Sequence, residues 1–193
     1  MMITIDNIYE AEYIINKSKF ISIAYPVFTE DECKKYLQEL NKKYGDATHI
    51  CFAYLLEFPA MEKCSDNGEP SGTAGKPMLE LLKKRKLNNV LLVVIRYFGG
   101  IKLGAGGLVR AYTNSGNLAL DKAKIIEVKE ICKYRIKVKY DDVNKVKGLI
   151  NSSFGEIKNI VYGDLAEIEF ISDSVDVFSN YDLEKIGSEK VWK

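Results

Sequence analysis

Hydrophobic positions in the first half of the chain repeat in ways that predict both strands and helices. Lys19–Val27 and Ile50–Leu56 are rich in β-branched and aromatic residues, which is typical of strands. Between them, Thr29-Glu-Asp-Glu32 has the form of a capping box and predicts the start of a helix. The apolar residues of that helix recur at helical spacing, at Cys33, Tyr36, Leu37, Leu40 and Tyr44. Val90–Ile95 is continuously apolar and predicts a strand that is buried on both faces.

Two glycine-rich stretches interrupt this pattern, and a helical pattern follows each of them. The first glycine loop, residues 65–76 (SDNGEPSGTAGK), precedes an apolar run, and Pro77 suits the first turn of its helix. The second glycine loop, residues 96–107 (RYFGGIKLGAGG), leads into a helix that we expect to end at about Lys122. One side of this helix is expected to face a core, at Leu108, Tyr112, Ser115 and Ala119.

The pattern changes near residue 130, which predicts a second domain. Apolar residues within 134–140 alternate with Arg135, Lys137 and Lys139, as in a strand with one solvated face. Asp141 and Asp142 are expected to cap a helix, whose apolar positions are Val143, Val146 and Ile150.

The remainder of this second domain predicts a hairpin and a second helix. Ile157–Tyr162 and Leu165–Phe170 have the composition of strands and are separated by Gly163-Asp164, a two-residue turn with glycine first. A helix is expected over Ser174–Ile186, and residues 191–193 leave little room for a full last strand. Strand, helix, hairpin and helix make up most of a ferredoxin-like unit. The expected fold class is therefore α+β, with domains at residues 1–130 and 131–193.

Composition places the chain among ordinary globular proteins, because 47% of its 193 residues are hydrophobic and 28% are charged. The longest apolar run is far too short to span a bilayer. The first residues include acidic side chains where a secretory signal carries basic ones, and no cysteines have C-x-x-C spacing. We therefore expect a cytoplasmic protein with reduced thiols, no membrane contact and no bound metal or other cofactor.

Charge is unevenly distributed, although the net charge is only +1. Residues 76–140 hold 15 Lys and Arg against 4 Asp and Glu, a net of +11, whereas residues 141–193 hold 6 against 11, a net of −5. A basic segment of this kind indicates an anionic partner such as RNA. The alternative is that these lysines only form solvated faces.

Both glycine loops have the form of an anion site, because a helix N-terminus offers free backbone N–H groups and the positive end of the helix dipole. The candidate anion-binding or nucleic-acid-binding residues are Gly72, Gly75, Lys76, Arg96, Gly99, Gly100, Lys102, Gly104, Gly106, Gly107 and Arg110. Neither loop matches a nucleotide fingerprint, since Pro77 stands where a P-loop has Ser or Thr and residues 104–109 lack the last glycine of the dinucleotide pattern. We expect no dinucleotide. The alternative is that the glycines only permit tight turns and close packing.

The polar residues of the first glycine loop allow a structural and a chemical interpretation. The favoured interpretation is that Asp66 and Glu69 accept hydrogen bonds from loop amides or pair with Arg96 or Arg110. The loop-organising set is then His49, Asp66, Glu69, Ser71 and Thr73. Alternatively, the two carboxylates act as general acid and base, or Ser71 or Thr73 is a nucleophile served by the chain's single histidine. His49, Cys51 and Cys64 match no zinc spacing, so we expect no metal site.

Three long motifs resemble the YigZ/IMPACT family over roughly residues 5–125. They are Ala47-Thr-His-x-Cys-x-Ala-Tyr54, the stretch Ser65–Met78 and the stretch Asn89–Tyr112. The chain resembles a bacterial two-domain member of this family. One departure is Asn67, which stands where similar members commonly have a second Asp.

The resemblance implies a fold and a field of function. It implies that the first domain is similar to domain IV of elongation factor G, and that the second is ferredoxin-like. It also implies a role in translational control, with no established catalytic residues to transfer. We therefore expect a non-enzymatic regulator that binds RNA or a ribosomal site through the two glycine loops, with Tyr97 and Phe98 available for base stacking. The alternatives are a regulator that binds a partner protein through the same loops and, third, a small hydrolase.

Overall fold

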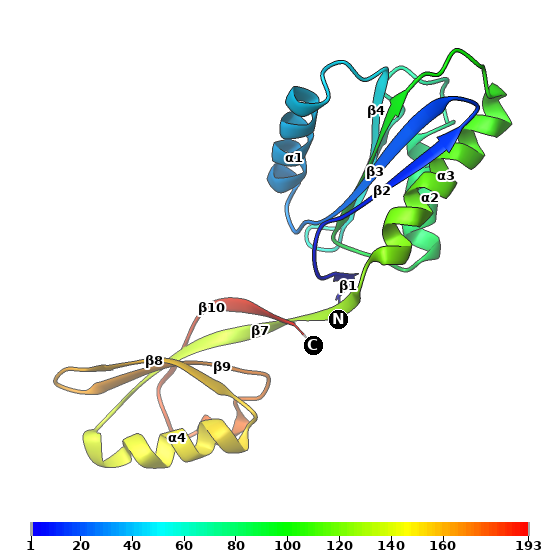
Figure 1. The fold of residues 1–193 in the computed structure, drawn as a ribbon. Coiled ribbons are helices and arrows are strands. Elements are labelled where there is room, and N and C mark those ends of the chain that lie inside the picture. Colours follow the sequence, from blue (N-terminus) through cyan, green and yellow to red (C-terminus); the bar gives the residue numbers. More distant parts are fainter. Residues whose placement is uncertain (1, 193) are drawn as a thin grey trace. The chain divides into compact units, whose positions relative to one another are not determined.

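The computed structural model describes residues 2–192, which form two compact units (Figure 1). The N-terminal unit is Met2–Glu127, and the C-terminal unit begins at Val128. Each unit has its own sheet and its own hydrophobic core. The protein is thus a mixed α and β structure with two sheets.

The N-terminal unit is a five-stranded antiparallel sheet with helices on both faces. The strand order is β2-β3-β6-β4-β5. Its strands are β2 (Tyr9–Ile15), β3 (Ser18–Pro26), β4 (His49–Leu56), β5 (Met61–Ser65) and β6 (Val90–Tyr97). Strand β1 (Met2–Ile5) belongs to the second sheet. The helices are α1 (Glu30–Lys43), α2 (Gly75–Lys84) and α3 (Gly104–Lys122). Figure 1 shows α1 on one face of the sheet and α2 with α3 on the other.

The central strand β6 contributes to two cores because both of its faces are covered. Leu92 and Val94 pack in the core beneath α2 and α3, whereas Leu91, Val93 and Ile95 pack in the core beneath α1. All five side chains are fully buried. The continuous apolar run predicted this double burial, and the prediction is confirmed.

Helix α1 begins as the sequence predicts. The Thr29 hydroxyl accepts a hydrogen bond from the Glu32 amide at 3.2 Å, and the Glu32 carboxylate accepts one from the Thr29 amide at 3.2 Å. Cys33 and Leu40 are buried against the sheet, so the predicted stripe is confirmed. The buried side of α3 is also confirmed, at Leu108, Tyr112, Ser115 and Ala119.

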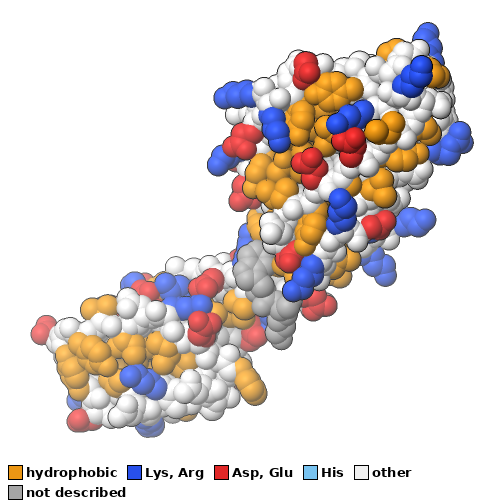
Figure 2. Space-filling model, in the orientation of Figure 1, with side chains coloured by type: hydrophobic (Ala, Val, Ile, Leu, Met, Phe, Trp, Pro, Cys, Tyr) orange, Lys and Arg blue, Asp and Glu red, His pale blue; other side chains and the backbone are white. Residues whose placement is uncertain are grey.

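The second sheet has five strands, with β1, β7, β9 and β8 in that order and β10 also paired with β7. The C-terminal unit adds one helix. Its elements are β7 (Ile125–Val138), α4 (Val143–Ser152), β8 (Glu156–Tyr162), β9 (Ala166–Ser172) and β10 (Leu183–Trp192). Helix α4 packs through Val143, Val146 and Ile150, as predicted. Figure 2 shows hydrophobic side chains gathered on the surface of this unit. Among its exposed aromatic residues, Tyr140 and Tyr162 stack with ring centroids 5.7 Å apart.

Three predictions for this unit are wrong. Asp142 makes no side-chain hydrogen bond to α4, because a short 3₁₀ turn at Tyr140–Asp142 leads into the helix instead. The hairpin loop has three residues rather than two, since Tyr162 pairs with Ala166. The helix predicted over Ser174–Ile186 is a 3₁₀ turn at Asp176–Phe178 followed by β10, so a ten-residue last strand is present. Pairing with β7, which the local sequence does not reveal, holds β10 extended.

Candidate functional site

The two glycine loops meet at one cavity of about 400 Å³ in the N-terminal unit. The first glycine loop contributes Glu69 and Pro70, and the second contributes Phe98, Lys102 and Gly104. His49 on β4, Arg96 on β6 and Thr48, which precedes β4, complete its wall. The sequence could not tell whether the loops adjoin. The fold brings them together because the first loop follows β5, the second follows β6, and both of these strands pair antiparallel with β4.

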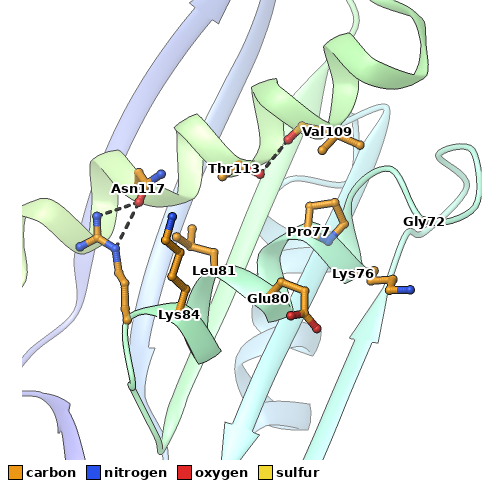
Figure 3. Close-up of a pocket in the computed structure, with 10 residues that line it drawn as sticks. Gly72, Lys76, Pro77, Glu80, Leu81, Lys84, Val109, Thr113 and Asn117 are labelled. Carbon is orange, nitrogen blue, oxygen red and sulfur yellow. Dashed lines mark hydrogen bonds between the residues drawn. The ribbon is translucent and has the colours of Figure 1, made fainter.

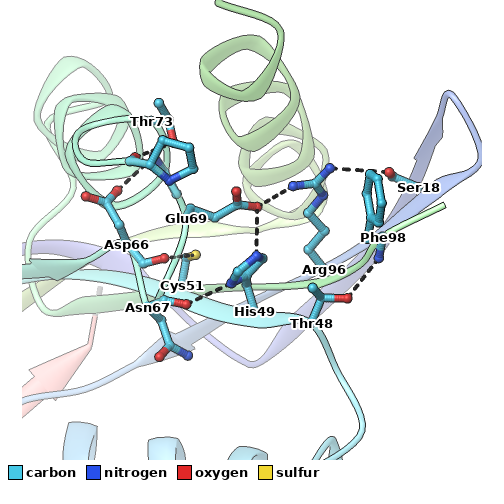
Figure 4. A network of polar contacts seen from close by, with 12 residues as sticks. Ser18, Thr48, His49, Cys51, Asp66, Asn67, Glu69, Thr73, Arg96 and Phe98 are labelled. Atoms are coloured by element: carbon cyan, nitrogen blue, oxygen red, sulfur yellow. Dashed lines mark hydrogen bonds and ion pairs between the residues drawn. The ribbon is translucent and has the colours of Figure 1, made fainter. Parts of the chain in front are cut away.

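A buried ion pair between Glu69 and Arg96 forms one wall of the cavity (Figure 4). Arg96 Nη1 donates to Glu69 Oε1 at 2.6 Å, and the Tyr112 hydroxyl donates to the same oxygen at 2.9 Å. Only 7% of Glu69 and 5% of Arg96 is exposed to solvent. Burial at this level is tolerated because each charge has its counterion beside it. The expected pairing of Glu69 with Arg96 is thus present, and it joins the two loops.

Aromatic rings fix the guanidinium of Arg96 from two directions. Its central carbon lies 5.4 Å from the ring centroid of Phe20 and 5.3 Å from that of Phe98. Both distances lie within the range of cation–π contacts. Arg96 Nε is buried and has no hydrogen-bond partner among the described residues. Arg96 is therefore held rigidly as part of the wall and is not a mobile surface cation.

His49 connects the first glycine loop to this ion pair. Its Nδ1 lies 2.9 Å from the carbonyl oxygen of Asn67, so Nδ1 carries the hydrogen and donates it. Its Nε2 faces the Glu69 carboxylate, 3.9 Å from Oε1 (Figure 4). The side-chain nitrogen Nδ2 of Asn67 in turn donates to the carbonyl oxygen of Ile50 at 3.0 Å. An ionised Asp at position 67 has no hydrogen to donate, which gives the departure at this position a physical role.

Asp66 occupies the N-terminus of α2. Its Oδ1 accepts hydrogen bonds from the amides of Ala74 and Gly75 at 2.9 and 2.8 Å, and its Oδ2 accepts one from Gly72 at 2.8 Å. Burial of the carboxyl raises its pKa, but these three bonds outweigh burial and hold the pKa of Asp66 below its usual value. The prediction that Gly72 and Gly75 would offer free amides to an anion is therefore wrong, because Asp66 already binds them.

The N-terminus of α3 is different, because no side chain caps it. Leu103 precedes the helix, and the amides of Gly104, Ala105 and Gly106 have no hydrogen-bond partner among residues 2–192. Gly104 and Ala105 line the cavity. The second glycine loop therefore keeps the free amides that the sequence predicts, next to the rigid pair of Arg96 and Glu69.

The glycines of the second loop serve different purposes. A Cβ at Gly99 would lie 2.0 Å from the backbone of Lys17, so this glycine permits close packing. Gly100 and Gly104 have φ angles of 86° and 70°, which favour glycine. A Cβ at Gly107 would lie 3.1 Å from the Cβ of Leu103. Gly106 has helical geometry and nothing within 4 Å of its would-be Cβ, so the fold gives no reason for a glycine there.

The positive charge of residues 76–140 is partly neutralised within the structure. Three basic side chains on β7 pair with acidic ones on β9, at 2.8–2.9 Å, and they are Lys133, Arg135 and Lys137. In the N-terminal unit, Lys102 of the second loop and Arg110 on α3 have no acidic partner among the described residues. Lys102 is exposed and lines the cavity. Arg110 is also exposed but is not among the residues that line it. Lys76 is exposed on α2 but lines a different groove.

Sequence comparison assigns the chain to a family. A model of the Impact N-terminal domain matches residues 16–120. The chain belongs to the Impact family. The Bacillus subtilis IMPACT family member YvyE is 42% identical over 167 residues, covering 86% of this chain and 77% of that protein. The Escherichia coli IMPACT family member YigZ is 34% identical over 151 residues, covering 77% and 74%. The resemblance to the YigZ/IMPACT family is thereby confirmed.

A solved structure shares the fold over nearly the whole chain. It is the crystal structure of a hypothetical protein, with 28% identity and a TM-score of 0.69, and the match covers 97% of this chain and 98% of that one. Within residues 2–192, no helix of this Impact-family chain is long and apolar enough to cross a membrane.

The residues expected of a hydrolase do not form a catalytic group in the described part of this Impact-family chain. The Thr73 hydroxyl donates to the Pro70 carbonyl at 2.6 Å, and Ser71 is exposed and lines no described cavity with His49. Burial raises the pKa of the Cys51 thiol to about 12, which keeps it protonated. Asp66 and Glu69 are held by amides and by Arg96. The geometry thus supports the structural interpretation of the two carboxylates over the chemical one.

Proposed function

We propose that this protein is a non-enzymatic, cytoplasmic regulator of translation that binds RNA or a ribosomal site, with an RNA phosphate at the N-terminus of α3. Three unpartnered amides at the start of a 19-residue helix support the proposal, because such a helix end favours an anion. Lys102 stands beside them without an acidic partner. Family membership supports the link to translation, as the resemblance of its motifs implied.

Gly106 is the observation that carries this proposal. A glycine inside a helix costs about 0.5–1 kcal/mol of stability relative to alanine. The fold gives no compensating reason for Gly106, whose would-be Cβ points into open space. A bare backbone at this point allows an RNA phosphate to approach the amides of the first turn of α3. Phe98, 44% exposed at the cavity, is placed to stack with a base next to that phosphate.

The architecture of both units is part of the same proposal. We propose that the N-terminal unit has the fold of domain IV of elongation factor G. We propose that the C-terminal unit is ferredoxin-like, with a 3₁₀ turn in place of the second helix. The sequence of strand, helix, two strands and strand in β7, α4, β8, β9 and β10 supports the second comparison. A chain with these two folds would suit a site on the ribosome.

The test uses two matched glycine substitutions in the full chain. Gly106→Ala and Gly148→Ala both place a methyl group in open space within a helix, so each is expected to raise stability by about 0.5–1 kcal/mol. Fluorescence anisotropy with a single-stranded RNA is expected to show about tenfold weaker binding for Gly106→Ala and unchanged binding for Gly148→Ala. Because Gly148 lies on α4, it controls for general effects of the added methyl group.

A salt titration measures the contribution of the phosphates. Two or three contacts with single-stranded RNA predict a slope of log affinity against log salt of about −1.5 to −2. Lys102→Ala is expected to reduce the magnitude of this slope by about 0.7, because one phosphate contact is lost. Lys42→Ala, on the exposed side of α1, is expected to change nothing. RNA affinity that is independent of salt, or equal for wild type and Gly106→Ala, would refute the proposal.

A further inference from the structure

A second depression lies between α2 and α3, with a volume of about 710 Å³ (Figure 3). Pro77, Leu81 and Lys84 line it on α2, and Val109 and Thr113 line it on α3. We call it the α2–α3 groove. No residue lines both this groove and the cavity at the glycine loops, so the two sites are separate.

The floor of the α2–α3 groove is aliphatic, and its polar groups are already engaged. Pro77, Leu81 and Val109 supply the apolar surface. The Thr113 hydroxyl donates to the Val109 carbonyl at 2.8 Å, and the side-chain oxygen of Asn117 accepts two hydrogen bonds from a neighbouring arginine. None of the described residues that line the groove is aromatic, so they offer no surface on which a nucleic-acid base would stack. This surface fits aliphatic side chains better than it fits RNA.

The rim of the groove carries two cations without partners. Lys76 and Lys84 are exposed, and no described acidic side chain lies within ion-pair distance of either. Lys84 lies eight positions after Lys76 on α2, which places them about 12 Å apart along the helix. Glu80 lies between them and pairs with Lys83 at 3.7 Å. Arg85 also lines the groove and pairs with an aspartate on α3. The unpaired charge of the rim is therefore positive.

We propose that the α2–α3 groove binds a short amphipathic helix of a partner protein, with carboxylates about two turns apart that flank aliphatic side chains. A helix laid in an apolar groove commonly anchors through residues at positions i, i+3, i+4 and i+7. Carboxylates seven or eight residues apart match the spacing of Lys76 and Lys84, and the aliphatic residues between them match Leu81 and Val109. The partner is thus an acidic protein segment, and the site is distinct from the one proposed for RNA.

The test selects helical peptides from a displayed library on the full chain. Enrichment of sequences with acidic residues seven or eight apart and aliphatic residues between them is expected. Val109→Glu places a carboxylate on the groove floor and is expected to weaken the selected peptides at least tenfold. Leu118→Glu is the matched control, because Leu118 is exposed to a similar extent on the same helix, 39% against 36%, but lines no part of the groove.

A charge exchange separates specific docking from general attraction. Lys84→Glu is expected to weaken the selected peptides about tenfold, and replacing the matching peptide glutamate by lysine is expected to restore binding to this variant. Failure to enrich any peptide, enrichment of basic peptides, or equal binding to wild type and Val109→Glu would overturn the proposal. So would tenfold weaker RNA binding by the uncharged variant Val109→Ala, since it would assign the groove to RNA. Gly106→Ala is expected to leave peptide binding unchanged, so this proposal and the RNA site fail independently.

Discussion

Replacing Asp66 by alanine tests whether this carboxylate holds the first glycine loop in place. The substitution removes the acceptor of three hydrogen bonds, from the amides of Gly72, Ala74 and Gly75. Ala74 and Gly75 are buried, so water does not replace the lost acceptor there, whereas Gly72 is half-buried and recruits water more easily. The N-terminus of α2 would then be left without a cap, because Ala74 has no side chain that can accept a hydrogen bond.

The magnitude follows from the two buried amides. A hydrogen bond to a charged group contributes about 1.5–3 kcal/mol, and an unpaired buried amide costs about 1–3 kcal/mol. Taking about 1.5–2 kcal/mol for each of Ala74 and Gly75, we expect Asp66→Ala to lower the free energy of unfolding by about 3–4 kcal/mol. For a unit of this size the midpoint of thermal unfolding should fall by about 10 °C. Asp31→Ala is the control, because the Asp31 side chain is 93% exposed and its ion pair is weak.

Two probes assign the effect to the N-terminal unit during urea unfolding. Far-ultraviolet circular dichroism follows the helices of both units, of which α1, α2 and α3 belong to the N-terminal unit. Hydrogen exchange of the β9 amides reports on the C-terminal unit, since β9 pairs with β7 and β8 there. Asp66→Ala should shift the circular dichroism transition and leave the exchange of the β9 amides unchanged.

The pH dependence gives the sign of the effect. Because the folded state lowers the pKa of Asp66, its stabilisation is fully present above the unfolded pKa of about 3.9 and is lost as pH falls through the folded value. The difference in stability between wild type and Asp66→Ala should therefore be constant from about pH 5 to 7 and shrink below about pH 4. A loss under 1 kcal/mol, or a difference that grows as the pH falls, would show that Asp66 does not hold the loop as an ionised carboxylate.

Two further predictions concern packing and thiol reactivity. Gly99→Ala should destabilise the N-terminal unit by about 3 kcal/mol, because the added Cβ would lie 2.0 Å from the backbone of Lys17, and a neutral effect in urea unfolding would contradict this packing. A thiol reagent should label the exposed Cys64 in the native protein, whereas buried Cys51, with a pKa raised to about 12, should react only after unfolding. Mass spectrometry of the labelled peptides checks this order, and rapid native labelling of Cys51 would contradict it.

The fold was predictable from sequence where a buried face makes apolar residues recur at regular spacing. It was less predictable for strands at the edges of the sheets. Helix α1 and strand β6 were predicted because their core positions recur regularly. Strands β2, β5 and β10 were missed or mistaken, and each pairs with a single neighbour. In β2 only Ala11 is buried, and in β5 no residue is, so neither strand has a strong alternation. Pairing with a distant strand holds such segments extended, and a local pattern does not contain that partner.

The sequence predicted that two glycine loops form the candidate site. It did not predict which of their backbone amides and cations are free to bind an anion. Both loops present glycines before a helix, and the sequence does not show that Asp66 folds back onto amides six to nine residues later. The predicted charge of residues 76–140 was also a poor guide to the surface. Lys133 and Glu169 are 36 residues apart in sequence and form an ion pair only because β7 and β9 are neighbours. Which charges are free is decided by sheet register.

The two helix ends provide an internal comparison for the proposed RNA contact. At α2, a carboxylate of the chain itself accepts three amide hydrogen bonds, and its pKa falls below the usual value as a result. At α3, the first three amides likewise make no hydrogen bond within the helix. Unlike Asp66 at α2, no side chain of the described residues accepts a hydrogen bond from them. A phosphate has the charge and the acceptor oxygens to make the same contact there. RNA affinity is therefore expected to depend on access to Gly106 on α3, whereas Asp66 affects stability through α2.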